Sequence, residues 1–175
     1  MKRIALKRLV FSALCLAAAF VLPFLTGQIP EFGQMLLPMH LPVLLCGLLC
    51  GWQWGLGVGA LAPLLRSAIL GMPPPYPTAV AMAVELATYG MVAGLCIRWL
   101  PKKTWSLYVS LIAAMLVGRL VWGGVMTILV GPSGFSFAAF LAGAFLTAWP
   151  GILLQLILLP PLTLALRRAG LPPLT

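Results

Sequence analysis

Long hydrophobic runs fill this chain, and short stretches rich in proline, glycine or basic residues separate them. A helix needs about 20 residues to cross a bilayer, so the length allows six spans joined by short loops. Proline and glycine mark the breaks between runs. The pattern predicts an all-α integral membrane protein, a six-transmembrane-helix bundle forming one domain over residues 1–175. The expected helices are 4–25, 39–51, 55–71, 78–99, 105–130 and 137–166.

The composition supports a membrane location. Hydrophobic residues make up 62% of the chain and charged residues 7%, whereas a soluble domain carries about 25% charged residues. The net charge of +9 does not indicate nucleic-acid binding, because the basic residues stand at the ends of hydrophobic segments and no polar fold surrounds them.

The basic residues also predict an orientation. With six spans, all three basic clusters fall on one side, and the opposite loops contain no lysine or arginine. Positive loops face the cytoplasm, so we expect both termini to be cytoplasmic and the proline-rich loops to lie outside. The basic clusters are 2–8, 98–103 and 167–168.

The first segment has two interpretations. Basic residues precede the apolar run Leu9–Leu25, and Ala17–Ala19 would suit the cleavage region of a signal peptide. We favour an uncleaved first helix, because the rest of the chain is polytopic and a first helix is needed to start it.

Small residues at four-residue spacing predict close helix contacts. Ala13 and Ala17 form such a pair in the first helix, where they suit either a partner protein or packing within the bundle. Glycines at 47, 51, 55 and 59 form a ladder at the same spacing that runs through the Trp52–Trp54 connection, and Gly90 and Gly94 form a further pair.

Three ionisable residues stand out in the first half of the chain: His40, Arg66 and Glu85. The turn Met72–Pro77 folds two helices back on each other and brings Arg66 and Glu85 to similar depth. Buried charges in a membrane usually face a bundle interior or a cavity. With Arg119 deeper in its own helix, the pattern predicts a pocket that opens to the outside.

An ion pair between Arg66 and Glu85 would neutralise two buried charges and have only a structural role. Alternatively, these residues bind a ligand. Two arginines against one glutamate leave one positive charge, which would favour a substrate with a carboxylate. Arg119 has no obvious partner in the sequence.

Tyr89 and Trp122 could add stacking and hydrogen bonds to such a pocket. His40 stands at a helix end, where it suits capping as well as contact with a substrate. Both roles stay open on the sequence alone.

The sequence offers little support for catalysis. It contains one histidine and two acidic residues, and no nucleophile with its base can be assembled. It has no phosphate-binding loop for ATP. We expect neither catalytic nor metal-binding residues, because the cysteines stand in apolar runs without further ligands nearby. These cysteines are Cys15, Cys46, Cys50 and Cys96.

The chain resembles the substrate-binding S components of energy-coupling factor (ECF) transporters, and is most similar to the broad branch that includes pantothenate, folate and cobalamin binders. The motifs that carry this resemblance are spread over most of the chain. They are PMHLPVLLCG at 38–47, LLRS at 64–67, GMPP at 71–74, ELATYG at 85–90 and PGILLQLILLP at 150–160.

The resemblance implies a subunit of the bacterial or archaeal cytoplasmic membrane that captures a vitamin or related micronutrient from outside. Such a subunit binds no cofactor. It docks on a transmembrane coupling protein and two ATPases, which use the ATP. Ala13 and Ala17 match the contact for the coupling protein, and the first loop, Thr26–Pro38, would gate the pocket. The substrate does not carry over between branches.

Two other functions remain as alternatives. A stand-alone secondary carrier would use Glu85 as its proton-binding group, and a small membrane enzyme would need a catalytic set that the sequence lacks. Among S-component substrates, a carboxylated vitamin such as pantothenate would suit two arginines, whereas cobalamin would suit the glycine-rich, aromatic surroundings.

Overall fold

The computed structural model describes residues 2–26, 35–101, 103–131 and 134–170. These residues form helices and turns and contain no strand. Most of the first loop, residues 27–34, lies outside the described part, and with it the expected gate. The elements are α1 (Lys2–Val21), a 3-10 turn η1 (Leu22–Thr26), α3 (His40–Cys50), α4 (Trp52–Leu70), an irregular turn η2 (Pro75–Ala79), α5 (Val80–Trp99), α6 (Thr104–Val130), α7 (Phe137–Leu141), a π-helical turn η3 (Ala142–Leu146) and α8 (Trp149–Arg168).

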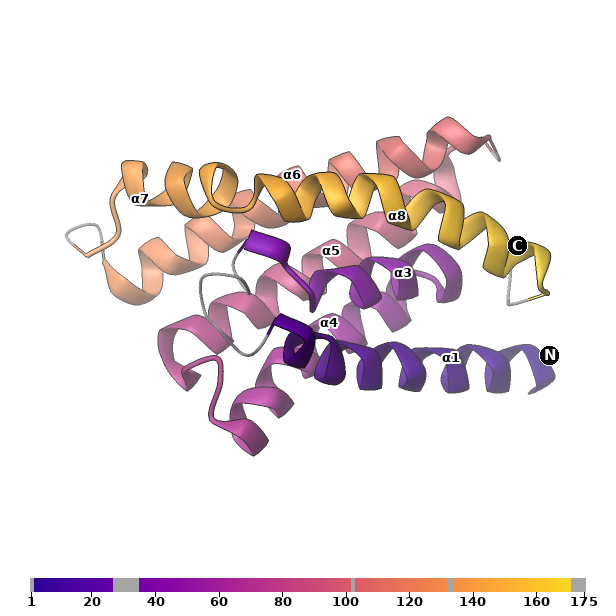
Figure 1. Ribbon diagram of the computed structural model, residues 1–175, viewed down its shortest axis with the longest axis horizontal. Helices are drawn as coiled ribbons and strands as arrows, with labels where there is room; N and C mark the ends of the chain where they lie inside the picture. Colours follow the sequence, from indigo (N-terminus) through magenta and orange to yellow (C-terminus); the bar gives the residue numbers. More distant parts are fainter. Residues whose placement is uncertain (1, 27–34, 102, 132–133, 171–175) are drawn as a thin grey trace.

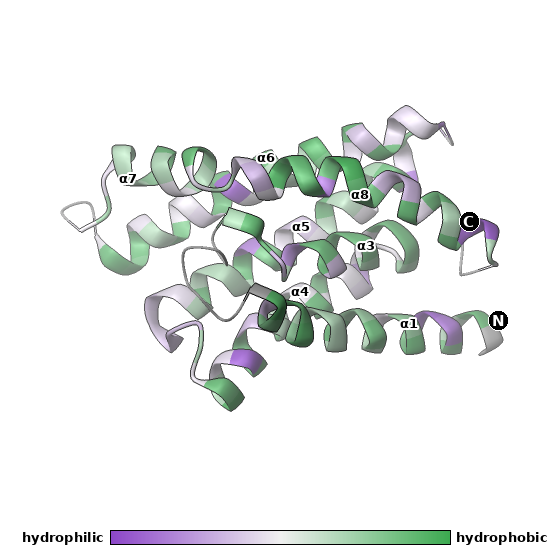
Figure 2. Ribbon diagram, viewed as in Figure 1, coloured by the Kyte–Doolittle hydropathy of each residue, from purple (hydrophilic) through white to green (hydrophobic). Residues whose placement is uncertain are grey.

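Several segments are long and apolar enough to cross a membrane, as the sequence predicted. Hydrophobic residues predominate along α1, α6 and α8 (Figure 2). The protein is therefore an all-helical, multi-pass membrane protein, while its six-span count stays a prediction. The candidate spans are Ile4–Leu25, Pro75–Trp99, Thr104–Val130 and Phe137–Arg168.

The basic clusters gather at one end of the bundle. Both termini lie at that end, together with the connection between α5 and α6 (Figure 1). The η2 turn and the connection between α6 and α7 lie at the opposite end. That the basic end faces the cytoplasm stays a prediction from the positive-inside rule.

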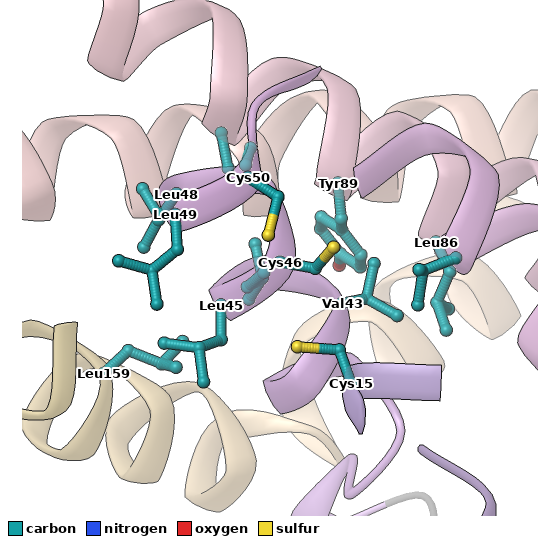
Figure 3. Packing of buried hydrophobic residues seen from close by; sticks show 14 of the residues in the cluster. Cys15, Val43, Leu45, Cys46, Leu48, Leu49, Cys50, Leu86, Tyr89 and Leu159 are labelled. Carbon is teal, nitrogen blue, oxygen red and sulfur yellow. The ribbon is translucent and has the colours of Figure 1, made fainter. Parts of the chain in front are cut away.

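The short helix α3 lies inside the bundle, in contact with α1, α4, α5 and α8. All of its residues except Leu41 are buried. Figure 3 shows Leu45 of α3 beside Leu159 of α8, with Cys15 of α1 on another side of the same helix. Its 11 residues span about 16 Å, roughly half of the hydrocarbon thickness of about 30 Å. His40, its first residue, is buried, so α3 begins within the bundle.

The connection between α3 and α4 is shorter than predicted. Residues 52–54 were expected to join the two helices, but α4 already begins at Trp52. Gly51 alone makes the turn, with φ 103° and ψ 167°, a conformation that side chains disfavour. Its N–H donates to the carbonyl of Gly47 at 3.2 Å. A single glycine therefore folds α4 back along α3.

The close approach predicted from the glycine spacing is present where α3, α4 and α5 meet. A Cβ on Gly55 would lie 2.6 Å from the carbonyl oxygen of Gly90, and a Cβ on Gly47 would clash with the same carbonyl. A Cβ on Gly59 would clash with the carbonyl of Leu86. The three helices therefore pack backbone against backbone, which fixes their spacing and rotation.

Two glycines on α4 provide a matched test of this packing. Gly59→Ala places a methyl group against the α5 backbone, so we expect overpacking to lower the free energy of unfolding by about 1–3 kcal/mol. Gly57→Ala, two residues away, meets open space and should leave stability unchanged or slightly raised. Thermal unfolding of both variants in detergent, followed by tryptophan fluorescence, measures the difference. Equal unfolding midpoints for Gly59→Ala and Gly57→Ala would contradict the packing role of Gly59.

Candidate ligand-binding site

Three helices bring a histidine, a glutamate and an arginine together in the bundle interior. The Oε1 atom of Glu85, on α5, lies 3.6 Å from Nε2 of His40 at the start of α3. The same oxygen lies 3.4 Å from Nη1 of Arg119 on α6. The exposed fractions of His40, Glu85 and Arg119 are 3%, 2% and 5%. We call these three residues the polar cluster.

Tyr89 forms an aromatic wall beside the polar cluster. It follows Glu85 by about one turn of α5, and its ring meets the ring of His40 edge-on at 5.1 Å between centroids. A Cβ on Gly118 would lie 2.7 Å from the Tyr89 ring, so α6 packs directly on that ring. Packing on both sides restricts the ring and, with it, the space next to His40.

The hydrogen-bonding capacity of the polar cluster is incompletely used. Both distances to Glu85 exceed the 2.7–3.2 Å typical of N–H···O bonds. Native proteins rarely leave buried polar atoms without a partner, and such atoms are often found at functional positions. Within the described part of the chain, the buried atoms without a hydrogen-bond partner include Nδ1 and Nε2 of His40, Oε1 of Glu85, and Nε and Nη2 of Arg119.

The ion pair considered as one alternative for Arg66 and Glu85 is not present, since Glu85 pairs with His40 and Arg119. Instead, Nη1 of Arg66 donates to the carbonyl oxygen of Phe20 at 2.6 Å, and the guanidinium lies over the ring of Phe24 at 5.1 Å. Phe20 stands in the last turn of α1, where carbonyls lack intrahelical donors. Arg66 therefore caps α1, an interaction that the depth of Arg66 and Glu85 along their own helices did not reveal.

The partner of Arg119 was also missed. The sequence assigned it none, whereas the structure pairs it with Glu85. The polar cluster thus holds one formal positive and one formal negative charge, those of Arg119 and Glu85. The excess positive charge predicted for the site included Arg66, which the structure shows at the end of α1, so a role for Arg66 in substrate binding stays a prediction.

Trp122 belongs to an aromatic group next to α7. Its ring packs edge-on against Phe135 at 5.4 Å and stacks on Phe140 at 6.3 Å between centroids. A surface groove of about 580 Å³ adjoins this group. The groove is lined by Leu120, Gly123, Gly124, Thr127, Phe135, Ser136, Phe137 and Phe140. Trp122 follows Arg119 by about one turn of α6, and its ring contacts phenylalanines.

A buried glutamine escaped the sequence analysis. Gln155 is only 1% exposed, and its Nε2 lies 3.5 Å from the carbonyl oxygen of Leu37, close to the start of α3. A glutamine within a long apolar run was a usable signal, because a polar side chain in a membrane segment needs a partner.

The two alanines of α1 face outward. Ala13 and Ala17 are both exposed, next to exposed Leu14 and Val10. Packing within the described part of the bundle therefore leaves them uncovered, which makes them available to lipid or to another protein.

A model of the family described as the substrate-specific component of ECF transporters matches residues 7–163. The chain belongs to this family. Neither the curated proteins nor the solved structures gave a match. As an S component, the protein is a binding subunit for transport and not an enzyme, and the geometry of its interior can be interpreted in those terms.

Replacing Arg66 tests its assignment as a cap in this S component. Arg66→Met keeps an apolar stem but removes the donor to Phe20, so we expect the free energy of unfolding to fall by about 1.5–3 kcal/mol, as for other hydrogen bonds that involve a charge. Arg98→Met, at an exposed position of α5, is the matched control. An unchanged unfolding midpoint for Arg66→Met would contradict the capping role and favour substrate binding by Arg66.

Proposed function

We propose that this S component captures a vitamin or related micronutrient from the outside and delivers it inward after docking on an ECF module. The observation that carries the proposal is the polar cluster, which is held by three helices and in which several buried donors and an acceptor lack a hydrogen-bond partner within the described structure. A ligand that supplies the missing partners would gain hydrogen bonds to charged groups, which are about twice as strong as neutral ones.

The polar cluster indicates the chemistry of the ligand. Arg119 and His40 offer donors, and Glu85 offers an acceptor. Because the two formal charges compensate, we propose a ligand that is uncharged at this contact and carries a donor next to an acceptor, as an amide, a ureido group or a heterocycle does. This revises the preference for a carboxylate, which depended on the charge of Arg66.

Access from the outside is supported by the position of the polar cluster. Glu85 is the sixth residue of α5, counted from the end that holds the η2 turn. That end lies opposite the basic clusters (Figure 1), and the positive-inside rule places it outside. Five intervals of 1.5 Å put Glu85 about 8 Å into the helix, a depth that a small molecule could reach from the outer face.

Docking on a transmembrane coupling protein is supported by the exposed pair Ala13 and Ala17, since small residues let a partner helix approach closely. We propose that two partner ATPases supply the energy and that this chain itself binds no cofactor. We place the assembly in the cytoplasmic membrane of a bacterium or archaeon.

A double substitution separates binding from folding. Arg119→Met alone removes the positive charge beside the buried Glu85 carboxylate, which keeps only His40 as its neighbour, and should cost about 3–5 kcal/mol of stability. Arg119→Met combined with Glu85→Gln removes both charges, so we expect near wild-type unfolding without any ligand-induced stabilisation. The measurement is a thermal-shift screen of purified protein against vitamins and their precursors, in which a ligand at 100 times its Kd adds about 2.7 kcal/mol to wild type.

A vitamin that stabilises the wild type and the double variant equally would remove the polar cluster from the binding site. The same ligand also tests the alternative that Glu85 serves a stand-alone carrier. Uptake into proteoliposomes that contain this chain without ATPases, and its loss in Glu85→Gln, would support the carrier and contradict the S-component mechanism.

The docking surface allows an independent prediction. Ala13→Trp places a large ring where a partner helix would approach, so we expect co-purification with the coupling protein to fall at least about tenfold while the unfolding midpoint of the isolated subunit is unchanged. Ala165→Trp, at an exposed position of α8, is the control. Undiminished co-purification of Ala13→Trp would exclude this face as the contact.

A further inference from the structure

The segment that leads into α3 has an unusual backbone. Leu37 has φ 51°, and among the described residues it is the one residue other than glycine with a positive φ. The left-handed region brings Cβ close to the following carbonyl, so a leucine adopts it only when its surroundings hold it there. Leu37 is buried and stands three residues before His40. The conformation at Leu37 therefore sets where α3, and His40 with it, begins.

The carbonyl oxygen of Leu37 is the point at which two parts of the chain meet. It accepts a hydrogen bond from the backbone N–H of His40 at 3.0 Å. The Nε2 amide of Gln155, on α8, also donates to this oxygen, over a longer distance of 3.5 Å, which makes it the weaker of the two hydrogen bonds. One carbonyl thus holds the first turn of α3 on one side and is tied to a different helix on the other.

A second contact on the same face of α8 holds the preceding residues. Gly151 precedes Gln155 by four positions, and residues at this spacing share a helix face. A Cβ on Gly151 would lie 2.6 Å from the carbonyl oxygen of Met35 and 2.9 Å from that of Leu36. The backbone of this segment therefore lies directly on α8, and a glycine is required for it to do so.

We infer that Gln155 is a positioning residue for His40. By donating to the Leu37 carbonyl it holds the left-handed turn, and the turn orients the first residue of α3 toward Glu85. The inference rests on the proposed function only in giving His40 a role in ligand binding. It also assigns a role to the PGILLQ stretch of α8, in which Gly151 makes room for the segment and Gln155 fixes it.

The single histidine of the chain makes a direct test possible. Diethyl pyrocarbonate acylates accessible imidazoles, and peptide mass spectrometry reports the rate at His40 in protein that carries a histidine-free tag. Gln155→Leu keeps the bulk of the side chain and removes the donor. We expect faster acylation of His40 and faster hydrogen–deuterium exchange over residues 35–44, each by about twofold, the lower end of the effect of one hydrogen bond, because this one is long.

Gln53→Leu is the matched control, because Gln53 is exposed on α4 and should leave both rates unchanged. Exchange over residues 80–99 shows whether Gln155→Leu disturbs the bundle as a whole. If it does, Gly151→Ala serves as the second variant, since it displaces the same segment through Met35 and should accelerate both rates at His40. Wild-type rates in a folded Gln155→Leu or Gly151→Ala protein would overturn the inference.

Neither readout uses a ligand. A vitamin panel without a hit would therefore count against the proposed function, whereas an unchanged acylation rate at His40 would count against the role of Gln155.

Discussion

The contact between the backbones of α3, α4 and α5 at Gly90 determines the rest of this structure. Lipid tails are as apolar as leucine, so helices in a membrane gain nothing from hiding hydrophobic surface and depend on close packing instead. Gly47 and Gly55 both face the carbonyl of Gly90, where any side chain would separate the helices. This contact fixes the rotation of α5. Glu85 consequently faces His40 on one side and Arg119 on the other, and Tyr89, directly before Gly90, packs against both neighbouring helices.

Unpaired carbonyls at helix ends explain the positions of several other polar side chains. Carbonyls at a helix C-terminus have no water to bind in the hydrocarbon region and need a donor from the protein. Arg66 donates to Phe20 at the end of α1, and Arg167 donates to the carbonyl of Leu48 at the end of α3, at 3.2 Å. At the exposed η2 turn, outside the bundle interior, the Tyr76 hydroxyl likewise donates to the carbonyl of Leu129 near the end of α6 at 2.6 Å. A buried arginine in such a protein is therefore as much a capping group as a substrate contact.

The sequence predicts the helices and the depth of their residues in the membrane. It does not predict how each helix is rotated about its axis or which helices it contacts. Long apolar runs predict the helical segments, and glycine spacing predicts that backbones come close. Distance from the proline-rich turn predicted similar depths for Arg66 and Glu85, yet a shared depth does not make two side chains face each other. The cap on α1 depends on α1 and α4 being adjacent, which no local pattern encodes. Gln155 was overlooked because its partner, the Leu37 carbonyl, is a backbone atom far away in the sequence.

The shortness of α3 connects these features. A helix of full bilayer length would place its first residue at the membrane surface, where a histidine has water for its ring nitrogens. With 11 residues, α3 instead begins inside the bundle, so His40 meets Glu85 and not solvent. The same shortness leaves the first turn of α3 in need of support, which comes from the Leu37 carbonyl and, through it, from α8. Burial of a polar helix start and its attachment to a distant helix therefore have a single cause, and together they place the unsatisfied ring nitrogens of His40 next to a charged pair.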